Sequence, residues 1–307
     1  MFEPSWYTAK LLSLLAEAVA ALALVILMWP AAATTVSTKS ELFIPERRVT
    51  RVATDFEGKK IVVLGGASGI GFKTAEDVIA AGGSAVIVGR PGRKLDDAVT
   101  SLSRSGTAWS VMADLTDWNQ VVEAQKQLAE NHPDATLLVN SAGLVRLKTF
   151  LDHQATDYDS YHDLNRATFF LTQTVVRGMV AGGQGGAIVN VGAMWAHQAL
   201  AATPSSAFSM AKAGLHALTH NLAIELAGEG IRVNAVAPAV TNTPHFDWLP
   251  ADQREATLQQ MAGLHPLGRV GTPQDLASAI TFLLSSASSW ITGAILNVDG
   301  GVMAGRN

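Results

Sequence analysis

The feature of this sequence that most constrains its fold is an alternation of short apolar runs with longer amphipathic segments between residues 61 and 298. Apolar runs of about three to five residues are typical of buried strands, and the longer segments between them are typical of helices. Since strands separated by helices pair in parallel, the pattern predicts an α/β fold with a doubly wound parallel sheet of about seven strands. The expected strands are 61–64, 85–88, 110–112, 137–139, 187–191, 232–236 and 295–298, and the expected helices are 73–81, 118–130, 158–180, 207–227 and 273–284.

A long apolar stretch lies near the amino terminus. From Leu11 to Trp29 the chain is apolar except for Ser13 and Glu17. A helix of this length spans about 28 Å, close to the hydrocarbon thickness of a bilayer. The sequence therefore predicts a membrane segment at 1–30 with its transmembrane helix at about 11–29, a polar linker at 31–57 and one α/β domain at 58–307.

Basic residues indicate the orientation of this helix. Lys10 and the amino terminus precede it, whereas the basic residues that follow it are Lys39, Arg47, Arg48 and Arg51. Because basic loops stay in the cytoplasm, we expect a single-pass membrane protein whose large domain faces the cytoplasm. Two alternatives are a signal peptide cleaved after the small residues 31–33 and a helix that binds membrane-protein partners through its alanine-rich stretch 16–23.

Composition argues against several classes of function. The net charge is −4 and the 22 Lys and Arg residues are scattered, so we expect no nucleic acid as a partner. The sequence has no cysteine, which rules out disulfides and thiolate metal sites. Its histidines lack the spacing of a ligand cluster, so we also expect no metal.

The first expected strand runs directly into the glycine-rich stretch LGGASGIG at 64–71. Glycines in such a turn let the backbone approach a pyrophosphate, whose charge the free N–H groups of the following helix attract. The spacing Gly-x-x-x-Gly-x-Gly departs from the Gly-x-Gly-x-x-Gly dinucleotide fingerprint. It therefore predicts a Rossmann-type nucleotide site only with support from motifs farther along the chain.

Those motifs occur, and they occur in order. They are ADL at 113–115, NSAG at 140–143, Asn165, IVNVGA at 188–193, the pair Phe208 and Lys212, IRVNAVAPAV at 231–240, ITG at 291–293 and VDGG at 298–301. With them, the chain from Lys59 to Met303 resembles a classical short-chain dehydrogenase/reductase.

The resemblance implies a nucleotide site built from several segments. It assigns Gly65, Ser68, Gly69, Ile70 and Gly71 to the phosphates, Asp114 and Leu115 to the adenine, Asn140, Ala142 and Gly143 to the cofactor cleft, and Pro238 and Thr243 to the nicotinamide end.

Arg90 bears on which nicotinamide nucleotide binds, because it follows the second expected strand. A guanidinium there would pair with a 2′-phosphate, whereas a carboxylate would bind a ribose 2′-OH. We therefore expect NADP(H) in preference to NAD(H). The alternative is that Arg90 only solvates its loop beside Arg93 and Lys94.

The resemblance also implies the catalytic positions. The family carries serine where this chain has Ala193, and tyrosine where it has Phe208, four residues before Lys212; Asn165 matches the family. In the family the tyrosine hydroxyl transfers the proton, another hydroxyl holds the carbonyl oxygen, and the lysine lowers the tyrosine pKa. Because Ala193 and Phe208 lack both hydroxyls, we expect hydride-transfer chemistry to be crippled.

Nearby side chains are candidate replacements for the missing donor. Ser205 and Ser209 flank Phe208, and Trp195 and His197 follow position 193. A serine hydroxyl ionises far less readily than a phenol, so we do not expect rescue. The two changes suit an engineered knockout and a natural loss of activity equally well.

Two functions remain consistent with the sequence. One is a membrane-anchored, NADP(H)-dependent carbonyl reductase or alcohol dehydrogenase with crippled chemistry, whose substrate is a hydrophobic carbonyl or alcohol. The other is a non-catalytic NADP(H)-binding pseudoenzyme subunit of a membrane complex. The family further implies a homo-oligomer formed through the helices near Asn165 and Lys212. It places a mobile lid over substrate, or else a subunit interface, at His245, Phe246, Trp248 and Leu249.

Overall fold

The computed structural model describes residues 55–247 and 249–305 of the 307-residue chain. The expected membrane helix at 11–29 and most of the expected linker lie outside the described residues. Among the residues that the structure describes, no helix is both long enough and apolar enough to cross a membrane. Phe56, within the expected linker, is buried in the hydrophobic core, so the packed domain begins before residue 58.

The described strands form one parallel sheet in the order β3-β2-β1-β4-β5-β6-β7. This arrangement confirms the predicted Rossmann-type sheet of seven strands. Within β1, Ile61 and Val63 pack into one hydrophobic cluster and Val62 and Leu64 into another, so both faces of the sheet are covered. The strands are β1 Lys60–Leu64, β2 Ser84–Gly89, β3 Ala108–Met112, β4 Leu137–Asn140, β5 Gly186–Val191, β6 Ile231–Pro238 and β7 Ile295–Val298.

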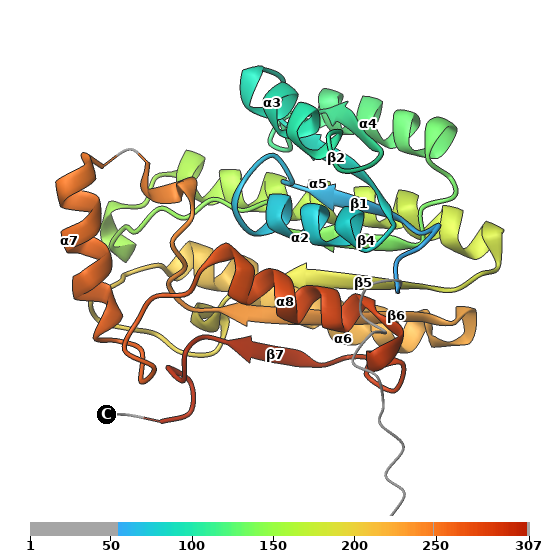
Figure 1. Ribbon diagram of the computed structural model, residues 1–307. Helices are drawn as coiled ribbons and strands as arrows, with labels where there is room; N and C mark the ends of the chain where they lie inside the picture. Colours follow the sequence, from blue (N-terminus) through green and yellow to red (C-terminus); the bar gives the residue numbers. More distant parts are fainter. Residues whose placement is uncertain (1–54, 248, 306–307) are drawn as a thin grey trace, which may run out of the picture. The chain divides into compact units, whose positions relative to one another are not determined.

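Helices cover the two faces in two layers. They are α2 Gly69–Ala80, α3 Arg93–Leu102, α4 Trp118–Asn131, α5 Ala155–Gly182, α6 Ser206–Glu225, α7 Ala251–Ala262 and α8 Pro273–Leu284. Helices α2, α3 and α8 pack on one face of the sheet, and α4, α5 and α6 pack on the other. Figure 1 shows α2 and α8 in front of the sheet, and α7 beyond the end to which the strand arrows point.

Two described helices, α3 and α7, were not predicted, and α2 begins four residues earlier than predicted. Helix α7 buries none of its residues, so its sequence lacks the apolar stripe that indicates a helix. Helix α3 does carry such a stripe, at Leu95, Ala98 and Leu102, which the sequence analysis overlooked. Helix α2 begins at Gly69 rather than at residue 73, because a glycine-rich first turn is indistinguishable from a loop in sequence.

The strand order places a crevice at the carboxyl ends of β1 and β4. These two strands are neighbours, and the chain winds outward from them in opposite directions, which is where ligands bind in doubly wound sheets. Gly65 follows β1 and Ala142 lies shortly after β4; a methyl group added to Gly65 would lie 2.6 Å from the Ala142 Cα atom. The glycine-rich turn therefore lies at the switch point of the fold.

Candidate functional site

The turn between β1 and α2 is closely packed around its glycines. Gly65 has φ of +78° and donates its N–H to the Val88 carbonyl at 2.8 Å. A methyl group on Gly71 would lie 2.7 Å from the Gly65 carbonyl oxygen, so the turn has no room for side chains at either position. A turn this tight exposes backbone N–H groups instead of side chains. It fits the pyrophosphate of a dinucleotide.

The first turn of α2 is open to an anion. Ser68 occupies the N-cap position, but its side chain makes no capping hydrogen bond, and the turn contains no acidic residue. The N–H groups there are consequently free of side-chain acceptors and carry the positive end of the helix dipole. Ile70 packs against the hydrophobic core and so anchors this turn. Thr243, after β6, faces the same turn: a methyl group on Gly69 would lie 3.5 Å from its Cβ atom.

The expected adenine-side residues lie at the ends of two adjacent strands. Arg90 directly follows β2 and is exposed, and β2 pairs with β3. After β3, the Asp114 carboxylate accepts hydrogen bonds from the Thr116 N–H at 2.9 Å and the Thr116 hydroxyl at 2.8 Å. Leu115 is buried against the core. Arg90 is thus an exposed cation at the carboxyl end of β2.

Asn140 is turned into the protein rather than into the crevice. Its side-chain N–H groups donate to Thr172 at 2.9 Å and to Asn190 at 2.7 Å, and Asn190 in turn donates to Thr219 at 2.8 Å. These buried bonds tie β4 and β5 to the helices behind them. Asn140 therefore braces the carboxyl end of β4 from within, and Ala142 and Gly143 follow it in the chain beside Gly65 and Lys212.

The four expected catalytic positions come together where α5 and α6 meet the segment that follows β5. Ala193 and Phe208 belong to one buried hydrophobic cluster, and the Lys212 ammonium lies 6.0 Å from the centre of the Phe208 ring. Lys212 donates to the Val191 carbonyl at 2.7 Å. Asn165 on α5 donates to the Ala211 carbonyl of α6 at 3.0 Å, which fixes the two helices against each other. The cluster contains an amine and an amide, and Ala193 and Phe208 contribute no hydroxyl.

Two aromatic residues enclose Phe208: Trp195, which the sequence offered as a candidate donor, and Tyr161, which it did not indicate. The rings of Tyr161 and Trp195 both lie 6.1 Å from the Phe208 ring. The Tyr161 hydroxyl is held by the backbone of Arg146, and burial raises the pKa of Tyr161. Tyr161 lies four residues before Asn165 on α5, so helical spacing was the one signal that could have indicated it.

The candidate replacement donors are engaged elsewhere. The hydroxyls of Ser205 and Ser209 lie 3.2 Å from each other. His197 is exposed, and its ring lies 4.7 Å from that of His216. Burial lowers the pKa of His216 to about 4, so this side chain is neutral near pH 7. Within residues 55–247 and 249–305, no three His, Asp or Glu side chains gather as metal ligands.

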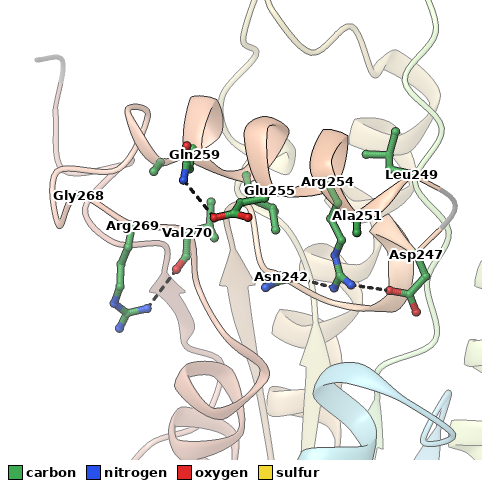
Figure 2. A pocket seen from close by; sticks show the side chains of 12 residues that line it. Asn242, Asp247, Leu249, Ala251, Arg254, Glu255, Gln259, Gly268, Arg269 and Val270 are labelled. Atoms are coloured by element: carbon green, nitrogen blue, oxygen red, sulfur yellow. Dashed lines mark hydrogen bonds and ion pairs between the residues drawn. The ribbon is translucent and has the colours of Figure 1, made fainter.

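Cavity space is distributed unevenly. An open pocket of about 770 Å³ lies between α7 and residues 268–270, and it includes Leu249 of the expected lid (Figure 2). Arg254 points from α7 toward Asn242 and Asp247, which it contacts at 2.8 Å and 3.0 Å. By contrast, the cavity that touches Phe208 holds only about 10 Å³. The larger space therefore lies outside the expected catalytic cluster.

Lys212 provides a testable pH dependence. Burial lowers the pKa of its ammonium from 10.5 to about 8, so the unfolded chain holds one more proton than the folded chain between these values. Unfolding then takes up a proton, and the free energy of unfolding should rise as pH increases from about 8 toward 10.5. Urea denaturation across this range should show that rise relative to Lys212→Met. Parallel pH profiles for the two proteins would contradict it.

Comparisons with known proteins agree with the observed fold. A family model described as enoyl-(acyl carrier protein) reductase matches residues 65–303. The chain is 39% identical over 253 residues to cis-4-hydroxycyclohexanecarboxylate dehydrogenase of Sinomonas cyclohexanicum, covering 81% of this chain and 98% of that protein. It is 34% identical over 251 residues to the 3-oxoacyl-(acyl-carrier-protein) reductase of Thermotoga maritima, with 80% and 98% covered.

One of the similar solved structures was determined with a bound nucleotide. The L-sorbose reductase of Gluconobacter frateurii, crystallised with NADPH and L-sorbose, superposes with a TM-score of 0.76 at 28% identity. The match covers 82% of this chain and all of the reductase. The two chains are thus similar in sequence as well as in fold.

Proposed function

Because the chain belongs to the classical short-chain dehydrogenase/reductase family of NAD(P)-dependent oxidoreductases, we propose that it is an NADP(H)-binding reductase scaffold whose hydride-transfer chemistry is crippled. The observation that carries this proposal is Phe208, which lies beside Ala193 and Lys212 and has no hydroxyl. Calorimetric titration of the unaltered protein with NADPH tests the binding half of the proposal. Saturable binding is expected, and its absence would refute the nucleotide site.

The residues present suit this nucleotide, which would supply the hydride when bound. The glycine turn at 65–71 offers N–H groups to the phosphates, and its lack of side chains leaves the room they require. Lys212 lies close to Gly143 and would hold the ribose hydroxyls with its ammonium. Asn165 keeps α6 in position through its bond to Ala211. What the chain fails to supply is a proton for the carbonyl oxygen, because Phe208 cannot donate one.

Arg90 supports NADP(H) as the nucleotide, since its exposed guanidinium can pair with a 2′-phosphate. Replacement by Asp should repel that phosphate and offer a carboxylate to the 2′-OH of NADH. We expect Arg90→Asp to weaken NADPH binding about tenfold or more and to strengthen NADH binding. Titration calorimetry with both nucleotides measures the change, with Arg93→Asp as the matched control. Equal effects on both nucleotides would contradict the assignment.

The proposed substrate is a hydrophobic carbonyl compound or alcohol. Small carbonyl and alcohol substrates are typical of the family, and the names of the similar dehydrogenases and reductases fit this class. The apolar lining around Phe208, formed by Leu144, Val145 and Trp195, favours an uncharged reacting group. The competing function is a non-catalytic NADP(H)-binding subunit, which the same missing hydroxyls favour. The homo-oligomer implied by the family stays a prediction.

We also propose that the chain is anchored in a membrane by the apolar segment 11–29, with its large domain in the cytoplasm. The full chain should stay in the membrane fraction after alkaline carbonate washing, whereas a chain that starts at residue 55 should be released. Protease added to sealed inverted vesicles should digest the large domain. Release of the full chain by carbonate, or a mature protein that lacks the segment, would favour the cleaved signal peptide instead.

A further inference from the structure

Two loops meet over Phe208 and close it off from solvent. Leu144 and Val145, in the loop after β4, pack against the buried cluster that contains Phe208 and Ala193, and Trp195, in the short helix Met194–Ala196 after β5, packs edge-on against the Phe208 ring. As a result Phe208 is only 4% exposed and Ala193 only 3% exposed. Phe208 therefore lies behind a wall of side chains rather than in an open cleft.

The two loops are fastened to each other and to the tryptophan. The Lys148 N–H of the first loop donates to the Pro204 carbonyl of the second at 2.9 Å. The Trp195 indole N–H donates to the Thr203 hydroxyl at 2.8 Å, directly beside Pro204. Trp195 also packs against a second cluster that contains Met194. Its ring is thus held in one orientation by a hydrogen bond and by contacts on two sides.

The closure leaves Ala193 and Phe208 with almost no solvent-accessible surface. On its other side, Phe208 borders a cavity of only about 10 Å³, which Tyr161 and Lys212 also line, so no open space reaches the ring from there either. A ketone could reach Ala193 or Phe208 only if the wall opened. Trp195 is the bulkiest part of that wall, and its hydrogen bond to Thr203 is the single polar contact that would have to break for the ring to turn.

We propose that Trp195, latched by Thr203, is a gate that sets which carbonyl compounds reach the nicotinamide end of the crevice. The gate admits small carbonyl compounds during brief openings and excludes bulkier ones. The selection between small and bulky carbonyl compounds rests on the proposed function. The access of a reagent to position 193 can be tested without nucleotide binding or turnover.

The absence of cysteine permits a direct measurement of access. Ala193→Cys adds one sulfur atom inside the wall, and its reaction with methyl methanethiosulfonate reports how often position 193 becomes accessible. Cys at position 289, made by Ser289→Cys at an exposed site, gives the unprotected rate. We expect the thiol at 193 to react far more slowly than the thiol at 289. Adding Trp195→Ala to Ala193→Cys should accelerate its modification about tenfold or more, and more for a bulky maleimide.

Matched variants separate the gate from general loosening of the fold. Trp195→Phe keeps most of the wall and should leave the thiol at 193 protected, whereas Thr203→Val removes only the latch and should accelerate modification. Thermal unfolding of each variant checks that the fold persists; if Trp195→Ala unfolds, Thr203→Val decides the result. The gate is refuted if the thiol at 193 reacts as fast as the thiol at 289 with Trp195 present. It is equally refuted if neither Trp195→Ala nor Thr203→Val changes the rate.

A kinetic experiment tests the substrate part. In the variant that carries Ala193→Ser and Phe208→Tyr, Trp195→Ala should lower KM for acetophenone about tenfold or more and change KM for butanone much less. Equal changes for both ketones would overturn the gate as a determinant of specificity. If the doubly restored variant stays inactive, the proposed function fails, and the labelling rates still decide whether the gate exists.

Discussion

Restoring both hydroxyls, by Ala193→Ser together with Phe208→Tyr, should raise the rate of NADPH-dependent ketone reduction about 10²–10⁴-fold above that of the unaltered protein. The phenol of a tyrosine at 208 would extend from a ring whose centre already lies 6.0 Å from the Lys212 ammonium. That ammonium would lower the phenol pKa and make it a better proton donor. The gain in rate should exceed the product of the gains from the two single reversions, because the two hydroxyls act as one unit.

Loss of NADPH absorbance with butanone, a ketone small enough to enter during brief openings of the wall, measures the gain. Each single reversion should recover much less activity than the pair. Lys212→Met in the restored background should remove the gain, which would link it to this cluster rather than to improved folding. If the doubly restored protein binds NADPH and remains inactive toward a panel of ketones and alcohols, the non-catalytic subunit becomes the better account.

The second large effect concerns the glycine turn. Gly65→Ala should weaken NADPH binding about 100-fold or more, because the added methyl group would lie 2.6 Å from Ala142 Cα and 2.7 Å from its nitrogen. The φ of +78° at Gly65 is also unfavourable for alanine. Together these effects should lower the free energy of unfolding by about 1–3 kcal/mol. Titration calorimetry and urea denaturation measure the two losses separately.

Gly182→Ala is the matched control. Gly182 ends helix α5 and has no atom within 4 Å of an added methyl group, so alanine there should leave both NADPH binding and stability nearly unchanged. If Gly65→Ala bound NADPH as tightly as Gly182→Ala, the turn after β1 would not be the phosphate site. The account of the crevice would then have to be abandoned.

Most of the fold could be predicted because its elements are periodic in sequence. Strand β1 is an uninterrupted apolar run, and both of its faces are covered by helices, as such a run indicates. Helix α7 could not be predicted by the same argument, since it stands beyond the strand ends and buries none of its residues. A helix that buries no face against a core needs no periodic apolar stripe in its sequence, so periodicity cannot predict it.

The candidate site was predictable only in part, for a physical reason. The glycine turn is local, but its spacing departs from the dinucleotide fingerprint, so it indicated a nucleotide site only together with the motifs farther along the chain. The closure over Phe208 depends on side chains from three separate segments, including Tyr161 on α5 and Trp195 after β5. Trp195 could be placed near position 193 from its place in the chain, whereas nothing in the sequence around Tyr161 indicates that it meets Phe208. Asn140 likewise gave no sign in sequence that its amide bonds to Asn190 inside the protein.

The central claim is that the chain retains its nucleotide site and has lost its proton donor. One experiment tests both parts: NADPH is mixed with an excess of the unaltered protein and butanone, and its fluorescence and absorbance are followed together. The account predicts an immediate change in NADPH emission, caused by binding, and no loss of NADPH absorbance afterwards. Unchanged emission would contradict the retained site, and oxidation of the bound NADPH at a rate similar to that of the doubly restored variant would contradict the lost donor.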